Sequence, residues 1–203
     1  VRLIYNTNFS RTTFKDIDVF ELWNKFDSVS IGASLDAEGD RAELMRKGTV
    51  WKETVENRKR MMKVCPNVDF YISSTVGLVN SLHVTDFHKS WVEQGLIKHG
   101  DFNFNLLQHP VWQRMDILPP EYKQQVKEKY ESHIEWLKDK DPLTRATKGY
   151  ESAINWMLEK DNQKHLDLHI EQTKKYDKIR NENTVDVFPE WKELFDKYDK
   201  NKT

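Results

Sequence analysis

Short apolar runs that alternate with helical stretches constrain the fold of the first half of this chain more than any other feature. The runs are rich in β-branched and aromatic residues and end at turn residues, which is typical of strands. They cover Val1–Tyr5, Val29–Leu35, Val68–Val76 and Phe102–Leu107. The helical stretches between them are Ile17–Phe26, Val50–Lys63 and Asp86–Gln94. This alternation predicts an α/β fold built on a parallel sheet or an open barrel. Four strands are too few to close an eight-stranded barrel.

The chain changes character after residue 118. Pro119-Pro120 opens a long charged helical stretch, Glu121–Lys138, whose apolar residues recur at helical spacing. Two more helical pieces follow, and the last short helix is expected from Phe188 onward. We therefore expect two parts, a strand–helix part over residues 1–118 and a helical extension over residues 119–203.

Composition excludes several classes of function. The 32 Lys and Arg nearly balance the 33 Asp and Glu, so no net field draws the chain to nucleic acid or to an anionic membrane. No apolar stretch approaches the roughly 20 residues of a membrane span, and the start lacks the pattern of a signal peptide. The single cysteine, Cys65, excludes an internal disulfide and fits a reducing cytoplasm. Because the first residue is not Met, we expect the natural protein to begin upstream.

Polar side chains follow the second predicted strand and point to a ligand site. Ser34 and Asp36 stand at the end of the strand, and Arg46 comes ten residues after the Asp. Strands of α/β folds carry their chemistry at their carboxyl ends. These three residues are therefore candidates for holding a polar small molecule with hydroxyl groups at one end and a carboxylate at the other. In the structural alternative, Ser34 and Asp36 cap the next helix and Arg46 is a solvated surface charge.

Three asparagines extend this polar rim. Asn8, Asn80 and Asn105 each lie at or just beyond the end of a predicted strand, although Asn is also a common turn residue. Motifs typical of dinucleotide, phosphate, serine-hydrolase and zinc-protease sites are absent. His165 and His169 have the spacing of a helical metal chelate but no obvious third ligand.

Several segments together resemble the radical S-adenosylmethionine (radical SAM) enzymes, in particular those with a twitch-type C-terminal extension. The resemblance covers most of the chain and is most specific over Leu3–Asn80. The segments that carry it are Tyr5-Asn6-Thr7-Asn8, Ala33-Ser34-Leu35-Asp36, Glu43-Leu44-Met45-Arg46-Lys47-Gly48, Trp51–Asn57, Ser74-Thr75-Val76 with Asn80, Asp177-Lys178-Ile179-Arg180 and Phe188-Pro189-Glu190. The resemblance implies a partial, open (β/α)6 barrel, of which the four strands here correspond to the third to sixth.

The resemblance also implies cofactors. Radical SAM enzymes bind S-adenosylmethionine at a [4Fe–4S] cluster held by a C-x-x-x-C-x-x-C loop, and they take an electron from a donor protein. That loop is absent here, so we expect the cluster ligands upstream of Val1 and expect the chain alone not to cleave the cofactor. The expected reaction is hydrogen abstraction from a peptide or a small-molecule substrate. No nucleic acid or membrane partner is expected.

Individual roles carried over from the family are as follows. Ser34 and Asp36 resemble the residues that contact the ribose or methionyl end of S-adenosylmethionine, and Arg46 resembles the partner of its carboxylate. The resemblance places Asn8 and Thr75 facing the barrel cavity, and Asn80 at the next loop or at the ligand. It places the strand Phe102–Leu107 at the adenine and His109 toward the substrate. Arg180 is expected in a structural ion pair rather than in catalysis.

Two other functions remain open from the sequence. The first is a non-enzymatic α/β binding or interaction module, whose helical second half presents Tyr, Trp and Phe to a partner. The second is a metal hydrolase that uses His165 and His169.

Overall fold

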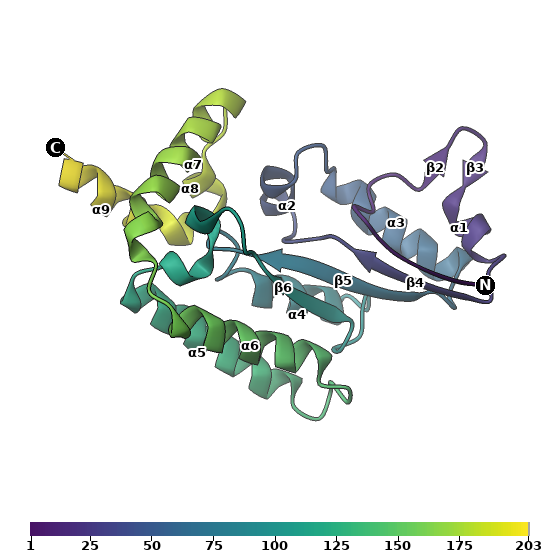
Figure 1. The fold of residues 1–203 in the computed structure, drawn as a ribbon. Helices are drawn as coiled ribbons and strands as arrows, with labels where there is room; N and C mark the ends of the chain where they lie inside the picture. Colours follow the sequence, from purple (N-terminus) through teal and green to yellow (C-terminus); the bar gives the residue numbers. More distant parts are fainter. Residues whose placement is uncertain (203) are drawn as a thin grey trace.

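The computed structural model describes residues 1–202, with the side chains of residues 201 and 202 left aside. A four-stranded parallel sheet forms its centre (Figure 1). The strands are β1 (Arg2–Thr7), β4 (Ser28–Ala33), β5 (Asp69–Val76) and β6 (Phe102–Leu106). They lie in the order β1–β4–β5–β6, so each strand pairs with the next one along the chain. All four strands predicted from the apolar runs are present, and the α/β class is confirmed.

The connections differ in part from the predicted ones. The expected helix over Ile17–Phe26 shortens to α1 (Val19–Trp23), because Ile17 and Asp18 form strand β3 against β2 (Thr13–Phe14). The Asp18 carboxylate caps α1 by accepting a hydrogen bond from the Phe20 amide at 2.9 Å. The stretch between Asp36 and Gly48, which is not among the predicted helices, contains helix α2 (Asp40–Met45). The other connections are α3 (Trp51–Val64) and α4 (Val84–Glu93).

Helices alone make up the second half. The pair α5 and α6 packs side by side, and α6 also packs on β6 (Figure 1). That contact requires a glycine, since a Cβ on Gly149 would lie 2.6 Å from Cβ of Phe104. The helices of this half are α5 (Pro120–Leu137), α6 (Arg145–Glu159), α7 (Leu166–Arg180), α8 (Thr184–Val187) and α9 (Lys192–Lys202). Short 3₁₀ helices are η1 (Val111–Gln113), η2 (Met115–Ile117), η3 (Gln163–His165) and η4 (Pro189–Trp191).

The helices cover one face of the sheet. On β5, Phe70 and Ile72 are buried, and the residues paired with them on β4 and β6 lie on the same face of the sheet. Arg58 of α3 lies over the Phe70 ring, and Phe87 of α4 contacts Phe102 of β6. Tyr150 of α6 contacts the ring of Phe104, the next aromatic residue on that face of β6. The apolar core therefore lies between this face and helices from both halves of the chain.

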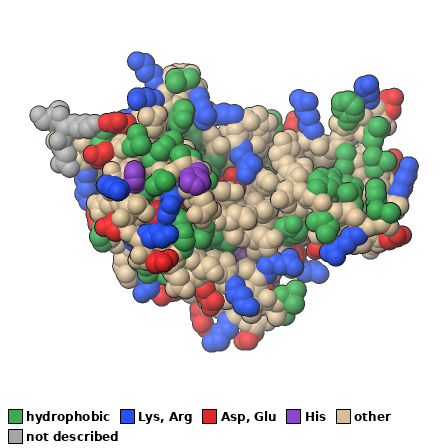
Figure 2. Space-filling model, viewed as in Figure 1, with side chains coloured by type: hydrophobic (Ala, Val, Ile, Leu, Met, Phe, Trp, Pro, Cys, Tyr) green, Lys and Arg blue, Asp and Glu red, His purple; other side chains and the backbone are tan. Residues whose placement is uncertain are grey.

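The opposite face is open and polar in the part of the chain that the structure describes. Tyr71 and Ser73 of β5 are half-exposed, and Asn105 of β6 donates a hydrogen bond to the Ser73 hydroxyl at 3.0 Å. Figure 2 shows neither hydrophobic nor charged side chains over most of the middle of this side. Parallel sheets are usually covered on both faces. The face is thus available to further polypeptide or to a ligand.

None of the helices within residues 1–202 is long and apolar enough to pass through a bilayer.

Candidate functional site

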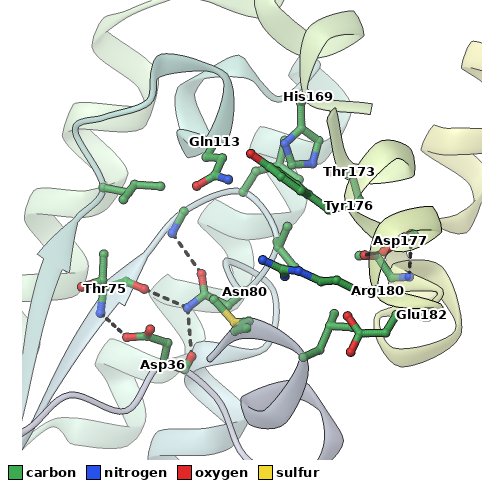
Figure 3. A pocket seen from close by; sticks show the side chains of 17 residues that line it. Asp36, Thr75, Asn80, Gln113, His169, Thr173, Tyr176, Asp177, Arg180 and Glu182 are labelled. Carbon is green, nitrogen blue, oxygen red and sulfur yellow. Dashed lines mark hydrogen bonds between the residues drawn. The ribbon is translucent and has the colours of Figure 1, made fainter. Parts of the chain in front are cut away.

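A cavity of about 260 Å³ lies at the carboxyl ends of β4, β5 and β6, below helix α7 (Figure 3). Parallel strands bring their ends to one edge of the sheet, and the helical half closes over that edge. The lining residues are Asp36, Leu44, Met45, Thr75, Gly77, Leu78, Val79, Asn80, Leu107, Gln113, His169, Thr173, Tyr176, Asp177, Arg180, Glu182 and Thr184. We call the side chains from the strand ends the floor and those from α7 and η1 the roof.

The floor is built around the Asp36 carboxylate. Its Oδ1 accepts a hydrogen bond from the Thr75 amide at 2.7 Å, and its Oδ2 accepts one from Nε of Arg46 at 2.6 Å. Hydrogen bonds to a charged group are the strong ones, so this pair ties the loop after β4 to β5. Arg46 uses only Nε in this contact. Its terminal guanidinium nitrogens make no hydrogen bond to another residue within 1–202.

Asn80 completes the floor and is fully buried. Its side-chain amide donates to the backbone oxygens of Asp36 at 2.9 Å and Thr75 at 3.0 Å. Its Oδ1 accepts from the Gly77 amide at 2.9 Å. Both donor hydrogens and the acceptor oxygen are therefore used, and the amide joins the ends of β4 and β5 with the loop that follows (Figure 3).

Gly77 lets the floor and the roof approach each other. A Cβ at this position would lie 2.6 Å from the backbone oxygen of Gln113. That same oxygen accepts a hydrogen bond from the Leu78 amide at 2.8 Å. A side chain at residue 77 would therefore separate the strand end from the 3₁₀ turn that carries Gln113.

His169 is the most buried polar residue of the roof, with 1% of its surface exposed. Its Nδ1 lies 3.0 Å from the backbone oxygen of Trp112. A carbonyl only accepts, so Nδ1 carries the hydrogen and Nε2 carries a lone pair. Nε2 has no hydrogen-bond partner among the described residues. Burial lowers the pKa of His169 to about 4, so the ring is neutral at pH 7.

Arg180 is the cation of the roof. Its guanidinium carbon lies 5.2 Å from the centre of the Tyr176 ring, and Figure 3 shows the group extending into the cavity between Tyr176 and Asn80. The structural ion pair that the sequence analysis expected is not found: no carboxylate within residues 1–202 pairs with Arg180. The side chains of Gln113 and Tyr176 likewise reach the cavity without a hydrogen bond to a described residue.

The carboxylates that line the cavity, in contrast, have partners. Asp36 pairs with Arg46, and Glu182 pairs with Lys47. Asp177 accepts hydrogen bonds from the amide and the hydroxyl of Thr184, at 2.9 and 2.7 Å. Asp36 and Glu182 are thus paired with cations, whereas Asp177 is held by neutral donors alone, and Arg180 is the lining cation that has no ion pair among the described residues.

Contacts distant in sequence hold the roof in place. The indole nitrogen of Trp191 donates to the backbone oxygen of Val79 at 2.8 Å. Arg41 of α2 makes a bidentate ion pair with Glu190, at 2.7 and 3.1 Å. These contacts, together with the Lys47–Glu182 ion pair, attach the end of the chain to the loops after β4 and β5.

The structure brings together four of the six predicted cofactor-binding residues. Asp36, Thr75 and Asn80 line the cavity, and Arg46 contacts Asp36. Ser34 and Asn8 do not line it. The Ser34 amide donates to the backbone oxygen of Thr7 at 2.7 Å, and the exposed Asn8 accepts at 3.3 Å from the Ser10 amide.

The sequence prediction missed the roof as a ligand-facing surface. Its members on α7 follow the spacing i, i+4, i+7 and i+11, which places them on one face of a helix. They are His169, Thr173, Tyr176 and Arg180. This polar stripe was visible in the sequence, but nothing there indicated which surface it faces.

The metal site considered for His165 and His169 does not form. His169 turns inward, away from a chelate with His165, and no group of three potential ligands occurs within the described part of the chain. His88 and His133 are buried in the core, with Nε2 of His133 3.0 Å from Nδ1 of His88. Burial lowers the pKa of both rings, so the pair is neutral.

No protein-family model, no curated protein and no solved structure matches this chain.

Proposed function

We propose that this chain is the C-terminal part of a radical SAM enzyme and that the floor is one wall of its S-adenosylmethionine site. The observation that carries the proposal is the convergence of Asp36, Arg46, Thr75 and Asn80 in one hydrogen-bonded network at the carboxyl edge of the sheet. All four are residues for which the sequence predicts a role in cofactor binding. Four parallel strands in chain order, with helices on one face, are also what a segment of an open (β/α) barrel requires.

The floor fits the polar parts of S-adenosylmethionine. The free guanidinium nitrogens of Arg46 suit a carboxylate, since the planar fork binds two oxygens at once. Asp36 fixes the orientation of that fork through Nε, and the Thr75 amide fixes Asp36. When bound beside its cluster, S-adenosylmethionine supplies the group that abstracts hydrogen from the substrate. The floor residues bind and orient it, and the roof excludes water from the same edge of the sheet.

The iron–sulfur cluster does not fit the residues of this chain. Three thiolates are needed, and the chain has one cysteine. Cys65 is buried at the end of α3, where desolvation raises its thiol pKa. Any cluster must therefore be held by residues outside these 203, and the proposal assigns no step of the reaction to it.

A second candidate is a binding module without chemistry. The observation that favours it is that Asn80 uses its polar atoms on the backbone and that Asp36 uses its carboxylate on the Thr75 amide and on Arg46. A purely structural network would have the same appearance. The two candidates differ in what precedes Val1.

The experiment is a calorimetric titration of the 203-residue chain with S-adenosylmethionine, combined with sequencing of the transcript upstream of Val1. We expect binding that weakens about tenfold in Arg46→Met, because a charged hydrogen bond is lost. Arg11→Met, which removes an exposed arginine outside the cavity, is the matched control. We expect a C-x-x-x-C-x-x-C loop upstream. An upstream frame without that loop leaves the binding module, and equal affinity in Arg46→Met removes the proposed role of the floor.

A further inference from the structure

The roof presents three polar groups that the protein itself leaves unused. They are the Arg180 guanidinium, the lone pair on Nε2 of His169 and the side-chain amide of Gln113. Of the three, only Nε2 of His169 is buried, and a buried polar atom without a partner is rare in folded proteins and calls for an explanation. Arg180 is exposed and Gln113 is half-buried. All three line the same cavity (Figure 3).

Arg180 selects for an anion. None of the three carboxylates that line the cavity pairs with its guanidinium: Asp36 and Glu182 pair with Arg46 and Lys47, and Asp177 accepts hydrogen bonds from Thr184. The position beside the Tyr176 ring holds the planar group and leaves its edge directed into the cavity. A carboxylate matches the two parallel N–H groups of that edge.

His169 selects for a hydrogen-bond donor. Because Nδ1 donates to the Trp112 carbonyl, the only free site on the ring is an acceptor. The neutral ring cannot serve as a second anion-binding cation. Nε2 itself has less than 1 Å² of accessible surface. A ligand that also satisfies His169 therefore brings a hydroxyl or an amine to this atom by displacing the side chains that cover it.

The rest of the wall is apolar and the space is small. Leu44, Met45, Leu78, Val79 and Leu107 line the cavity between the floor and the roof. Its volume of 260 Å³ equals that of about nine water molecules in the liquid. This is below the usual range of roughly 300–1,000 Å³ for sites that bind drug-sized ligands. A short aliphatic chain fits this wall.

We propose that the cavity binds a small carboxylic acid that carries a hydroxyl or amine group and a short apolar chain. The carboxylate pairs with Arg180, the hydroxyl or amine donates to Nε2 of His169, and the apolar chain lies against the leucines of the wall. Gln113 can donate to the second carboxylate oxygen. This inference does not rest on the proposed radical chemistry and holds equally for a binding module.

The test uses the full chain and isothermal titration with four probes. Leucic acid has all three features, isocaproic acid lacks the hydroxyl, leucic amide lacks the carboxylate, and inorganic phosphate is an anion without an apolar chain. We expect leucic acid to bind at least about tenfold more tightly than each of the other three, the size of one lost hydrogen bond to a charged or buried group.

Variants assign the contacts. Arg180→Met is expected to weaken leucic acid binding by about tenfold or more. Lys178→Met removes a neighbouring, exposed cation of α7 that does not line the cavity, and is expected to bind as the parent chain does. His169→Phe is expected to remove the preference for leucic acid over isocaproic acid. Because that variant replaces a buried residue, the two acids are also compared on the parent chain, where folding is not in question.

Several results would overturn the inference. Equal binding of leucic acid by Arg180→Met and the parent chain excludes Arg180 as the anion site. Equal affinity for leucic acid and isocaproic acid in the parent chain excludes the donor to His169. Phosphate binding without leucic acid binding shows a simple anion site. Titration with S-adenosylmethionine in parallel separates this inference from the proposed function, since either ligand can bind without the other.

Discussion

The floor and the roof of the cavity are both polar, but they use their polar atoms differently. In the floor, Asn80 directs its side chain to backbone atoms, and the Asp36 carboxylate accepts from the Thr75 amide and from Arg46. In the roof, His169 and Arg180 leave atoms without a protein partner. Saturated polar groups stabilise and position the chain, whereas unsaturated ones are available to a ligand. A change in the floor should therefore cost stability, and a change in the roof should mainly cost binding.

The largest effect is expected from Asn80→Leu. The substitution leaves two backbone oxygens and one amide without their partner in a fully buried position. We expect the free energy of unfolding to fall by about 3 kcal/mol, since each unsatisfied buried group costs roughly 1–3 kcal/mol. Urea unfolding followed by circular dichroism measures it.

Asn105→Leu is the matched control for that prediction. Asn105 ends the neighbouring strand and bonds to Ser73 and Ser74, but its side chain is exposed. We expect a loss of about 0.5 kcal/mol. Equal losses in the two variants would contradict the structural role given to the floor.

Gly77→Ala tests the contact between the floor and the roof. The added Cβ would meet the Gln113 carbonyl, which must move and weaken its hydrogen bond with the Leu78 amide. We expect a loss of about 2 kcal/mol in the free energy of unfolding, the usual cost of forcing a methyl group into a packed site. An unchanged midpoint in urea would show that the two parts are not in tight contact.

His169→Gln tests the roof through its pH dependence. Burial lowers the pKa of His169 in the folded state to about 4, below the ordinary value of 6.5. Between these two pH values the unfolded chain binds a proton that the folded chain does not, so stability falls as the pH falls. His83 and His133 act in the same direction and remain in the variant.

The variant should therefore lose less stability on acidification than the parent chain. Between pH 7.5 and pH 5.5 we expect the difference to be about 1 kcal/mol, from the proton linkage of one histidine. Urea midpoints at the two pH values give this number. Parallel pH profiles for the two proteins would mean that His169 is not buried as described.

The sheet was predictable because each of its strands has a recognisable local sequence pattern. In the run Val68–Val76, the sequence places Phe70, Ile72 and Ser74 on one face, and β5 occupies nearly the same range, Asp69–Val76, with that face buried. The short elements were not predictable in this way. Ile17 fits a helical pattern but pairs with Phe14 across a two-residue turn, and α2 has only one fully buried residue to mark it, Ala42.

The same distinction applies to the site. Asp36, Thr75 and Asn80 were found because strand ends of a parallel sheet meet at one edge, which is a rule of topology. The roof depends on where α7 docks. That position is set by long-range contacts such as Trp191 to Val79 and Arg41 to Glu190, which no local pattern reveals. Arg180 is an example, since the resemblance implied a structural ion pair, whereas the docking of α7 places it, exposed and without an ion pair, at the edge of a cavity.

The claim that the roof serves binding and the floor serves stability is tested most directly by measuring stability and binding together on Arg180→Met. We expect a urea midpoint within experimental error of the parent chain, because Arg180 makes no ion pair or hydrogen bond among the described residues. We also expect at least about a tenfold loss of affinity for leucic acid. A lowered midpoint with unchanged affinity would contradict the binding role of the roof, because Arg180 would then be a structural residue like those of the floor.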